Sequence, residues 1–265
     1  MYSFEYQRPK SVKDAVAALG KCEDGKFLAG GMTLIPTLKQ RLAQPSDLID
    51  LQGVEGLAGI RKEKGALVVG AMTTHAAVAA SDEVRKSIPA LAHLASVIGD
   101  AQVRHRGTIG GSIANADPAA DYPAAVLGLG ATIQTDKRSI AADDFFTGLF
   151  ETALGEDELI TAVHFPVPKR AGYSKFPNPA SRYAVVGVMV AETADGVRVA
   201  VTGAGPSAFR VADMERALGA EFAPDSVAST KVPANGLNSD IHASAEYRAH
   251  LVTVMAKRAV AAALA

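Results

Sequence analysis

The sequence of 265 residues predicts an α+β fold, and three observations lead to this class. Short apolar runs typical of strands alternate with helical patterns through the first and middle parts of the chain. Two longer apolar runs then meet at Asp195-Gly196, which is a strong signal for an antiparallel hairpin. Helical patterns close the chain, so we expect a boundary near Pro166–Gly172, followed by a small α+β unit.

In the first part of the chain, a glycine pair separates a strand from a helix. Ser11 is a typical N-cap for an early helix, and Gly20 is a typical stop. Leucines at positions 34, 38 and 42 recur every four residues directly after Gly30-Gly31, as on one face of a helix. The expected elements are a helix over 11–20, a strand over 26–29, a helix over 34–42 and a strand over 47–51.

The second part contains a second glycine-rich turn, which lies between two helical patterns. Gly99 is expected to stop the first helix, and Asp121 is a typical N-cap for the second. The turn runs from Arg106 to Ser112 and contains Gly107, Gly110 and Gly111. The expected elements are a strand over 66–71, helices over 74–78, 89–98 and 122–127, and strands over 131–135 and 159–165.

The third part is expected to pair two strands and to pack helices against them. Tyr183 begins the first of the two apolar runs that flank Asp195-Gly196. The segment from Phe222 to His242 is polar and irregular, so it is either a loop or a partner contact. The expected elements are strands over 183–192 and 197–201, and helices over 211–218 and 245–264.

Composition excludes several classes of protein. The net charge of −1 argues against nucleic acid or an anionic membrane surface as the main partner. The only cysteine, Cys22, excludes an intrachain disulfide and a thiolate-ligated iron–sulfur cluster held by this chain alone. No apolar run approaches the ~20 residues that span a bilayer, and the N-terminus lacks the pattern of a signal peptide. We expect a cytoplasmic protein without a transmembrane segment.

The two glycine turns together indicate a ligand with a central pyrophosphate. Each is expected to expose backbone N–H groups, and a side chain at Gly30, Gly31, Gly110 or Gly111 is expected to hold a bulky anion away. A cradle made of two separate loops suits a dinucleotide. Neither turn matches the dinucleotide motif G-x-G-x-x-G, so ordinary structural turns remain an alternative.

Several polar residues have both a structural and a functional interpretation. Asp117 and Asp121 are interpreted as a turn residue and a helix cap, or as the carboxylates of a metal-dependent hydrolase, and Asp121 also as an acceptor for a ligand hydroxyl or ring N–H. Tyr183 is interpreted either as a core residue or as a flat surface for a flavin ring. Lys175 is most simply an exposed strand lysine. The histidines show no spacing typical of a metal site.

The order of motifs resembles the FAD-binding medium subunit of the xanthine dehydrogenase and carbon monoxide dehydrogenase family of molybdenum hydroxylases, and the carbon monoxide dehydrogenase branch most. The similarity runs nearly from end to end. It departs from the family pattern at Met32, Ser112 and Arg182. The matching motifs are Tyr6-Gln7-Arg8-Pro9, Leu28-Ala29-Gly30-Gly31-Met32-Thr33, Val69-Gly70-Ala71-Met72-Thr73-Thr74, Gly107-Thr108-Ile109-Gly110-Gly111-Ser112 and Ala116-Asp117-Pro118-Ala119-Ala120-Asp121.

This resemblance implies a noncovalently bound FAD, and the residues themselves indicate no catalytic group and no metal ligand on this chain. The first turn would hold the ADP half, and the second would hold the pyrophosphate and ribityl region. Tyr183 would lie beside the flavin ring, and the change at Arg182 concerns that ring's surroundings. The cofactor-binding residues implied are Leu28, Ala29, Gly30, Gly31, Met32, Thr33, Leu34, Thr108, Ile109, Gly110, Gly111, Ser112, Asp121, Ile160, Lys175 and Tyr183.

The resemblance further implies a two-part FAD-binding domain of the vanillyl-alcohol-oxidase (PCMH) type, with subdomains over 1–55 and 56–170. A C-terminal domain of the carbon monoxide dehydrogenase flavoprotein type would follow over 171–265. The implied complex is a dimer of heterotrimers, with molybdopterin on a large subunit and [2Fe–2S] clusters on a small subunit. Electrons would pass through FAD to a quinone, NAD or oxygen. A free-standing flavin-dependent reductase and a nonenzymatic binding protein are the alternatives.

Overall fold

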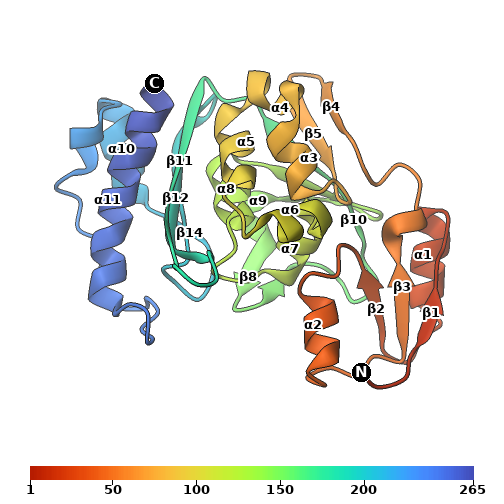
Figure 1. Ribbon diagram of the computed structural model, residues 1–265. Coiled ribbons are helices and arrows are strands. Elements are labelled where there is room, and N and C mark those ends of the chain that lie inside the picture. The colour runs from red at the N-terminus through yellow and green to blue at the C-terminus, as the bar shows by residue number, and fades with distance from the viewer.

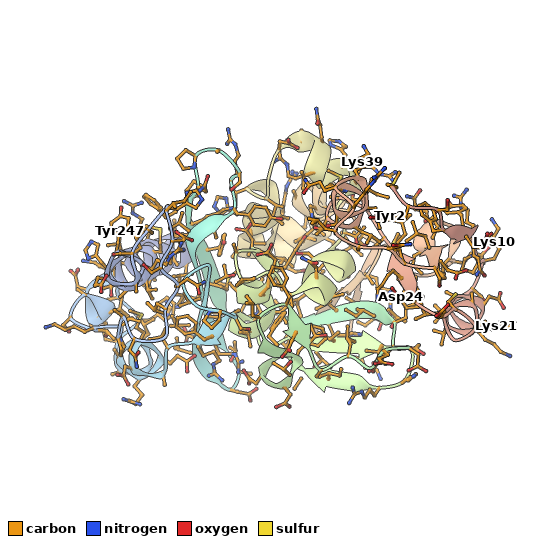
Figure 2. All side chains as sticks on the ribbon, turned by 90° about the horizontal axis from the view of Figure 1, so that it is seen from below. Tyr2, Lys10, Lys21, Asp24, Lys39 and Tyr247 are labelled. Atoms are coloured by element: carbon orange, nitrogen blue, oxygen red, sulfur yellow. The ribbon has the colours of Figure 1, made fainter.

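The computed structural model describes residues 1–265 and is layered along its length (Figure 1). The N-terminal part lies at one end and helix α11 (Ala245–Leu264) lies at the other. Figure 2 shows the same order, with Tyr2 and Lys10 far from Tyr247 on helix α11. None of the helices combines the length and apolar character needed to cross a bilayer.

A three-stranded parallel sheet forms the N-terminal part, with the strand order β1-β3-β2. Helix α1 packs its buried Ala15 and Leu19 into a small apolar cluster beside this sheet. Ser11 caps this helix by accepting a hydrogen bond from the Asp14 N–H, as its position in the sequence predicts. The elements are β1 (Glu5–Gln7), α1 (Val12–Leu19), β2 (Gly25–Leu28), α2 (Leu34–Lys39), β3 (Asp47–Asp50) and η1 (Leu51–Gly53).

The central part is a five-stranded antiparallel sheet with the order β4-β5-β10-β6-β7 and a set of short helices. The largest apolar cluster of the protein lies between these helices and strands β5 and β10. The elements are β4 (Ile60–Glu63), β5 (Ala66–Gly70), α3 (His75–Ala80), α4 (Asp82–Ser87), α5 (Pro89–Ser96), α6 (Ala101–Arg106), α7 (Ile109–Asn115), α8 (Tyr122–Gly128), β6 (Thr132–Thr135), β7 (Ser139–Ala141), α9 (Ala142–Phe145), β8 (Phe146–Gly148), β9 (Glu151–Thr152) and β10 (Ile160–Pro166).

The C-terminal part is a four-stranded antiparallel sheet that lies between two layers of helices (Figure 1). Helix α11 packs on one face, and helices α5 and α8 pack on the other. Side chains of β12 alternate between the faces, so Met189 joins the central apolar cluster while Val188 and Val190 join the α11 cluster. The remaining elements are β11 (Arg170–Pro177), β12 (Ala184–Thr193), β13 (Gly196–Thr202), β14 (Phe209–Arg210), α10 (Ala212–Ala220) and η2 (Pro224–Val227).

The predicted hairpin is confirmed, since β12 and β13 pair with Thr193 opposite Gly196. The helix predicted over 34–42 is too long, because α2 ends at Lys39. Arg41 takes a left-handed backbone with φ 60°, and the Leu42 N–H donates to the Thr37 carbonyl. Leu42 therefore leaves the helical face on which the leucine spacing placed it, and it is exposed.

The second glycine turn is a helix rather than a turn. Thr108 caps helix α7 by accepting a hydrogen bond from the Gly111 N–H, and Gly110 and Gly111 lie in the first turn of that helix. Helix α6 precedes it with Asp100 as its N-cap. Neither helix is predicted by apolar spacing, because their sequences are rich in glycine or basic residues.

Candidate functional site

A cavity of about 810 Å³ lies where the three parts of the chain meet. This volume falls within the range of about 300–1,000 Å³ that is typical of ligand pockets. Of the predicted site residues, Leu28, Ile109 and Lys175 are absent from its wall. Those that line it are Ala29, Gly30, Gly31, Met32, Thr33, Leu34, Thr108, Gly110, Gly111, Ser112, Asp121, Ile160 and Tyr183.

The first glycine segment presents free backbone donors to this cavity. The N–H groups of residues 29–34 donate to no atom of the protein, although all of these residues line the cavity. Gly31 takes φ +73°, so the chain bends here in a conformation that favours glycine. A run of free N–H groups at such a bend forms a concave site for an anion. This part of the sequence prediction agrees with the geometry.

The second glycine segment does not present free donors in the way that the sequence predicts. The N–H groups of Ile109 and Gly110 donate to the carbonyls of Thr73 and Ala71. Those of Gly111 and Ser112 donate to the side chain and carbonyl of Thr108. Its backbone donors from 109 to 112 are therefore used within the fold, and its contribution to the cavity is made by small side chains.

The two segments approach each other directly at Gly30, and Gly31 and Gly110 are also closely packed by protein atoms. A Cβ atom at Gly30 would lie 2.0 Å from the Arg106 carbonyl oxygen, and one at Gly110 would lie 2.6 Å from the Ala71 Cβ. A Cβ at Gly31 would meet Ile35. The expectation that side chains here would fill ligand space is therefore wrong at these three positions. These glycines permit close packing of the protein around the cavity.

Several polar side chains on the cavity wall make no hydrogen bond within the chain. Among them are the hydroxyls of Thr33 and Ser112 and the amide of Asn115. Asn115 lies at the end of α7 and was not among the residues predicted from the sequence. On a helix, Asn115 lies one turn after Ser112 and on the same side. This spacing was not recognised because residues 106–112 were interpreted as a turn.

Asp121 is a buried carboxylate at the cavity wall; it stands at the N-cap position of α8, as predicted, but its side chain does not cap the helix. Its backbone is helical, and its side chain makes no cap hydrogen bond. Its carboxylate accepts from the Tyr173 hydroxyl and lies 2.9 Å from the Lys175 Nζ. Burial raises the pKa of Asp121, and the Lys175 ammonium opposes this rise.

Lys175 is buried rather than exposed, with 5% of its side-chain surface accessible. Its Nζ also donates to the Val97 carbonyl, 3.1 Å away. Lys175 therefore lies behind Asp121 and reaches the cavity only through that carboxylate. The ion pair ties β11 of the C-terminal sheet to the start of α8.

Tyr183 lies in a loop rather than in the strand predicted over 183–192, and it lines the mouth of the cavity. Its side chain is 44% exposed, which removes it from the core. Asn178 holds this loop, because its Oδ1 accepts from the N–H groups of Ala180 and Ser181. Arg182 has φ 61°, a left-handed conformation that is uncommon for a residue of this type.

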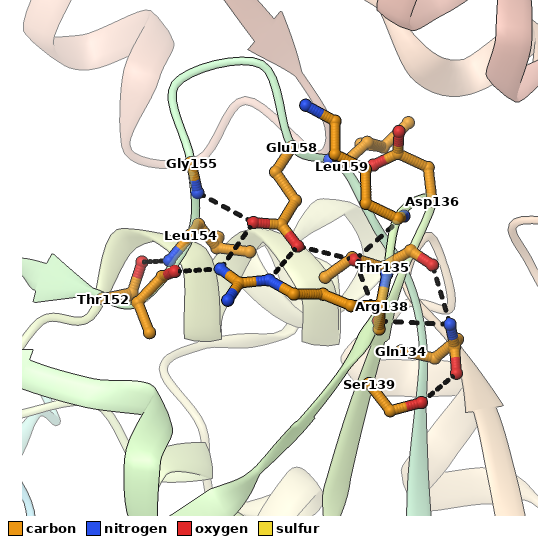
Figure 3. A network of polar contacts seen from close by, with 12 residues as sticks. Gln134, Thr135, Asp136, Arg138, Ser139, Thr152, Leu154, Gly155, Glu158 and Leu159 are labelled. Atoms are coloured by element: carbon orange, nitrogen blue, oxygen red, sulfur yellow. Dashed lines mark hydrogen bonds and ion pairs between the residues drawn. The ribbon is translucent and has the colours of Figure 1, made fainter.

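An ion pair between the buried Glu158, which lines the cavity, and the half-exposed Arg138 fixes another part of the cavity wall (Figure 3). The Glu158 carboxylate accepts from Arg138, from the Thr135 hydroxyl and from the Gly155 N–H. These partners, Arg138 first, lower the pKa of Glu158 to about 2. The network holds the chain that leads into Ile160, which is buried and lines the cavity.

The structure offers no ligand cluster for a metal-dependent hydrolase. No group of three or more histidine, cysteine, aspartate or glutamate side chains is placed to hold a metal ion. Asp121 pairs with Lys175 and accepts from Tyr173, and the Asp117 Oδ1 accepts from the Ala119 N–H. Asp117 is therefore a turn residue, as one of its interpretations predicts.

Comparison with known proteins identifies the family. A family model described as the FAD binding domain in molybdopterin dehydrogenase matches residues 2–168. The nicotine 6-hydroxylase medium subunit of Paenarthrobacter nicotinovorans is 39% identical over 97% of this chain and 96% of its own length. The carbon monoxide dehydrogenase medium chain of Afipia carboxidovorans is 38% identical over 97% of this chain and 96% of its own length.

Solved structures agree with this. Quinoline 2-oxidoreductase from Pseudomonas putida 86 superposes with a TM-score of 0.91 and 30% identity, covering 99% of this chain and 97% of that chain. Reconstituted CO dehydrogenase from Oligotropha carboxidovorans gives a TM-score of 0.90 and 35% identity, over 99% and 98% of the two chains. The chain therefore belongs to the FAD-binding medium subunits of the molybdenum hydroxylases, a family of oxidoreductases. The predicted fold class and family are confirmed.

Proposed function

We propose that this chain is the subunit through which electrons leave a molybdenum hydroxylase, with FAD held in the cavity described above. The observation that carries this proposal is the run of free N–H groups over 29–34 at the cavity wall. FAD, when bound, supplies the redox chemistry, and the protein supplies orientation, polarity and access.

The residues divide the ligand between them according to their chemistry. The free N–H groups of the first segment suit the diphosphate, because they are neutral donors at a concave bend. The hydroxyls of Thr33 and Ser112 and the amide of Asn115 suit phosphate and sugar oxygens. Tyr183, half-exposed at the mouth, suits the flavin ring, and Asp121 suits a polar group at the inner end.

The partners we propose are a small iron–sulfur subunit and a large molybdopterin subunit, assembled as a dimer of heterotrimers. Relatives named as medium chains or medium subunits support this arrangement. The chain's only cysteine supports it too, because one thiolate is too few to hold a cluster. We further propose three structural units over 1–55, 56–170 and 171–265, and a place in the cytoplasm.

The similarity of this chain to its relatives does not identify the substrate that the proposed complex oxidises. Relatives of similar identity are named for nicotine and for carbon monoxide, and a more distant one for xanthine. Residues that contact the substrate belong, in this proposal, to the large subunit. A quinone, NAD or oxygen is the electron acceptor in the proposal, and Arg182 beside the cavity mouth is the residue to examine first.

The test is an absorption spectrum of the purified chain, together with co-purification after expression alongside the large and small chains of a molybdenum hydroxylase from the same source. We expect a yellow protein whose extracted flavin is FAD and which retains both partners. A protein that stays colourless after incubation with FAD contradicts the proposal. Turnover of NADH by the isolated chain, without partners, supports the free-standing reductase instead.

A further inference from the structure

His75 lies at the start of helix α3 and lines the same cavity. Only 4% of its surface is accessible, so it forms part of the cavity wall rather than of the outer surface. It directly neighbours the segment that joins helices α6 and α7. A Cβ atom at Gly107 would lie 2.6 Å from the His75 Nε2, so this position requires glycine.

The two ring nitrogens of His75 differ in their surroundings. Nδ1 is fully enclosed and has no hydrogen-bond partner in the protein. Nε2 also has no partner in the chain, but it is not among the enclosed atoms. Because the little surface that His75 exposes belongs to the cavity wall, Nε2 is the polar atom that a ligand in the cavity can reach.

The imidazole is neutral near pH 7. Burial, together with the nearby Arg104 guanidinium, lowers the pKa of His75 to about 4. A neutral imidazole carries one N–H donor and one acceptor, and the partner of each nitrogen decides which is which. A proton on the enclosed Nδ1 would have no acceptor, and an unsatisfied buried donor is costly.

The neighbouring Tyr122 side chain gives the His75 Nδ1 no hydrogen-bond partner. The Tyr122 ring centroid lies 5.3 Å from that of His75, and the Tyr122 hydroxyl is also buried without a partner. Burial raises the pKa of Tyr122, so the phenol keeps its proton and remains a donor. The Tyr122 hydroxyl makes no hydrogen bond to His75, so it offers no acceptor for a proton on Nδ1, which leaves the proton on Nε2.

We propose that His75 is a positioning residue for FAD, and that its Nε2–H donates a hydrogen bond to an oxygen atom of the bound cofactor beside Gly107. The proposal rests on the function proposed above, since it requires FAD in this cavity. It adds a neutral side-chain donor from helix α3 to the backbone donors of residues 29–34. No resemblance or sequence pattern assigned this role to His75.

A matched pair of variants tests the position of the donor. In His75→Gln the side-chain amide reaches about as far as Nε2, whereas in His75→Asn it reaches about as far as Nδ1. We expect FAD to bind the His75→Gln apoprotein within about 3-fold of the wild type. The His75→Asn and His75→Phe apoproteins should bind it about 5- to 10-fold more weakly, the loss expected for one hydrogen bond. Titration followed by flavin fluorescence measures these affinities, and circular dichroism checks that each variant is folded.

A nitrogen-15 NMR spectrum of the wild-type histidines provides a second readout that does not depend on any variant. We expect the His75 proton on Nε2 in the apoprotein and a shift of this N–H signal when FAD binds. A proton on Nδ1, or equal affinities for His75→Asn and wild type, overturns this inference while leaving FAD binding intact. A wild-type protein that binds no FAD overturns the proposed function and, with it, this inference.

Discussion

Buried charged side chains at the cavity are each neutralised by a partner from a distant part of the chain. Asp121 pairs with Lys175, and Glu158 pairs with Arg138. An isolated buried charge is strongly unfavourable, so a buried carboxylate near the ligand requires such a partner. The Glu158 carboxylate accepts more hydrogen bonds than the Asp121 carboxylate. Because its pKa is lowered, its contribution to stability can be measured from the pH dependence of unfolding.

Replacing Glu158 by Gln should reduce the free energy of unfolding by about 1–3 kcal/mol near pH 7, because charged hydrogen bonds are lost. The pKa of Glu158 is about 2 when folded and is higher in the unfolded chain. This carboxylate therefore stabilises the protein above its unfolded pKa, and the contribution is lost as pH falls through about 2. The difference between wild type and Glu158→Gln should therefore stay constant near neutral pH and shrink once the pH falls below the unfolded pKa.

Denaturant unfolding from neutral pH down to about 3 measures this difference. Asp157→Asn is the matched control, because Asp157 neighbours Glu158 but pairs with Lys137 at the surface. We expect little change in that variant. A difference for Glu158→Gln that does not vary with pH, or an equal effect in the control, would show that the network in Figure 3 contributes less than its contacts indicate.

The sequence predicted which residues belong to the site better than it predicted what surrounds each of them. Asp121 and Lys175 are both named by the resemblance, but they lie 54 positions apart, so no local pattern predicts that they pair. Helix-cap preference described Asp121 as a cap because aspartate is common there. His75 and Glu158 were not predicted, since burial and orientation give them their roles and neither is visible in spacing.

At the level of elements, the cavity depends on the close approach of the α6–α7 junction to the first glycine segment. Gly30 lies against the Arg106 carbonyl, and a Cβ at Gly111 would lie 3.5 Å from the Ala29 Cβ. A backbone carbonyl at a helix end cannot move aside as a flexible side chain can. The separation of these segments is therefore fixed by the absence of a side chain at Gly30.

Gly30→Ala should separate the two segments and weaken FAD binding by at least about 10-fold, because the added Cβ would lie 2.0 Å from the Arg106 carbonyl oxygen. Titration of the apoprotein with FAD measures the loss. Gly219→Ala in helix α10 is the matched control, since nothing lies within 4 Å of its Cβ. The control should bind FAD normally and be more stable by about 0.5–1 kcal/mol. Normal FAD affinity in Gly30→Ala would contradict this account of the junction.

Elements with strong apolar periodicity were predicted well, and elements without it were not. The strands around residues 66–70, 160–166 and 184–202 and the helix over 245–264 follow their patterns. Helix α7 was predicted as a turn because Gly110 and Gly111 are poor helix formers. Packing of Gly110 against Ala71 and capping by Thr108 stabilise it instead, and these are tertiary effects.

At the scale of the whole molecule, the cavity exists only because three parts of the chain meet. The N-terminal segment contributes residues 29–34, the central part contributes α7 and Ile160, and the C-terminal part contributes the loop up to Tyr183. The resemblance predicted most of this set, and the structure adds Asn115, Glu158 and His75 to the same wall. Tyr183, which lines this cavity, is 44% exposed.

Amide hydrogen exchange over residues 29–34, with and without FAD, tests the central claim most directly. These N–H groups have no partner in the protein, so they should exchange rapidly in the apoprotein. We predict strong protection of this segment when FAD binds, while the already bonded amides of Gly110 and Gly111 change much less. Unchanged exchange over residues 29–34 in a protein saturated with FAD would contradict the claim that this segment holds the diphosphate.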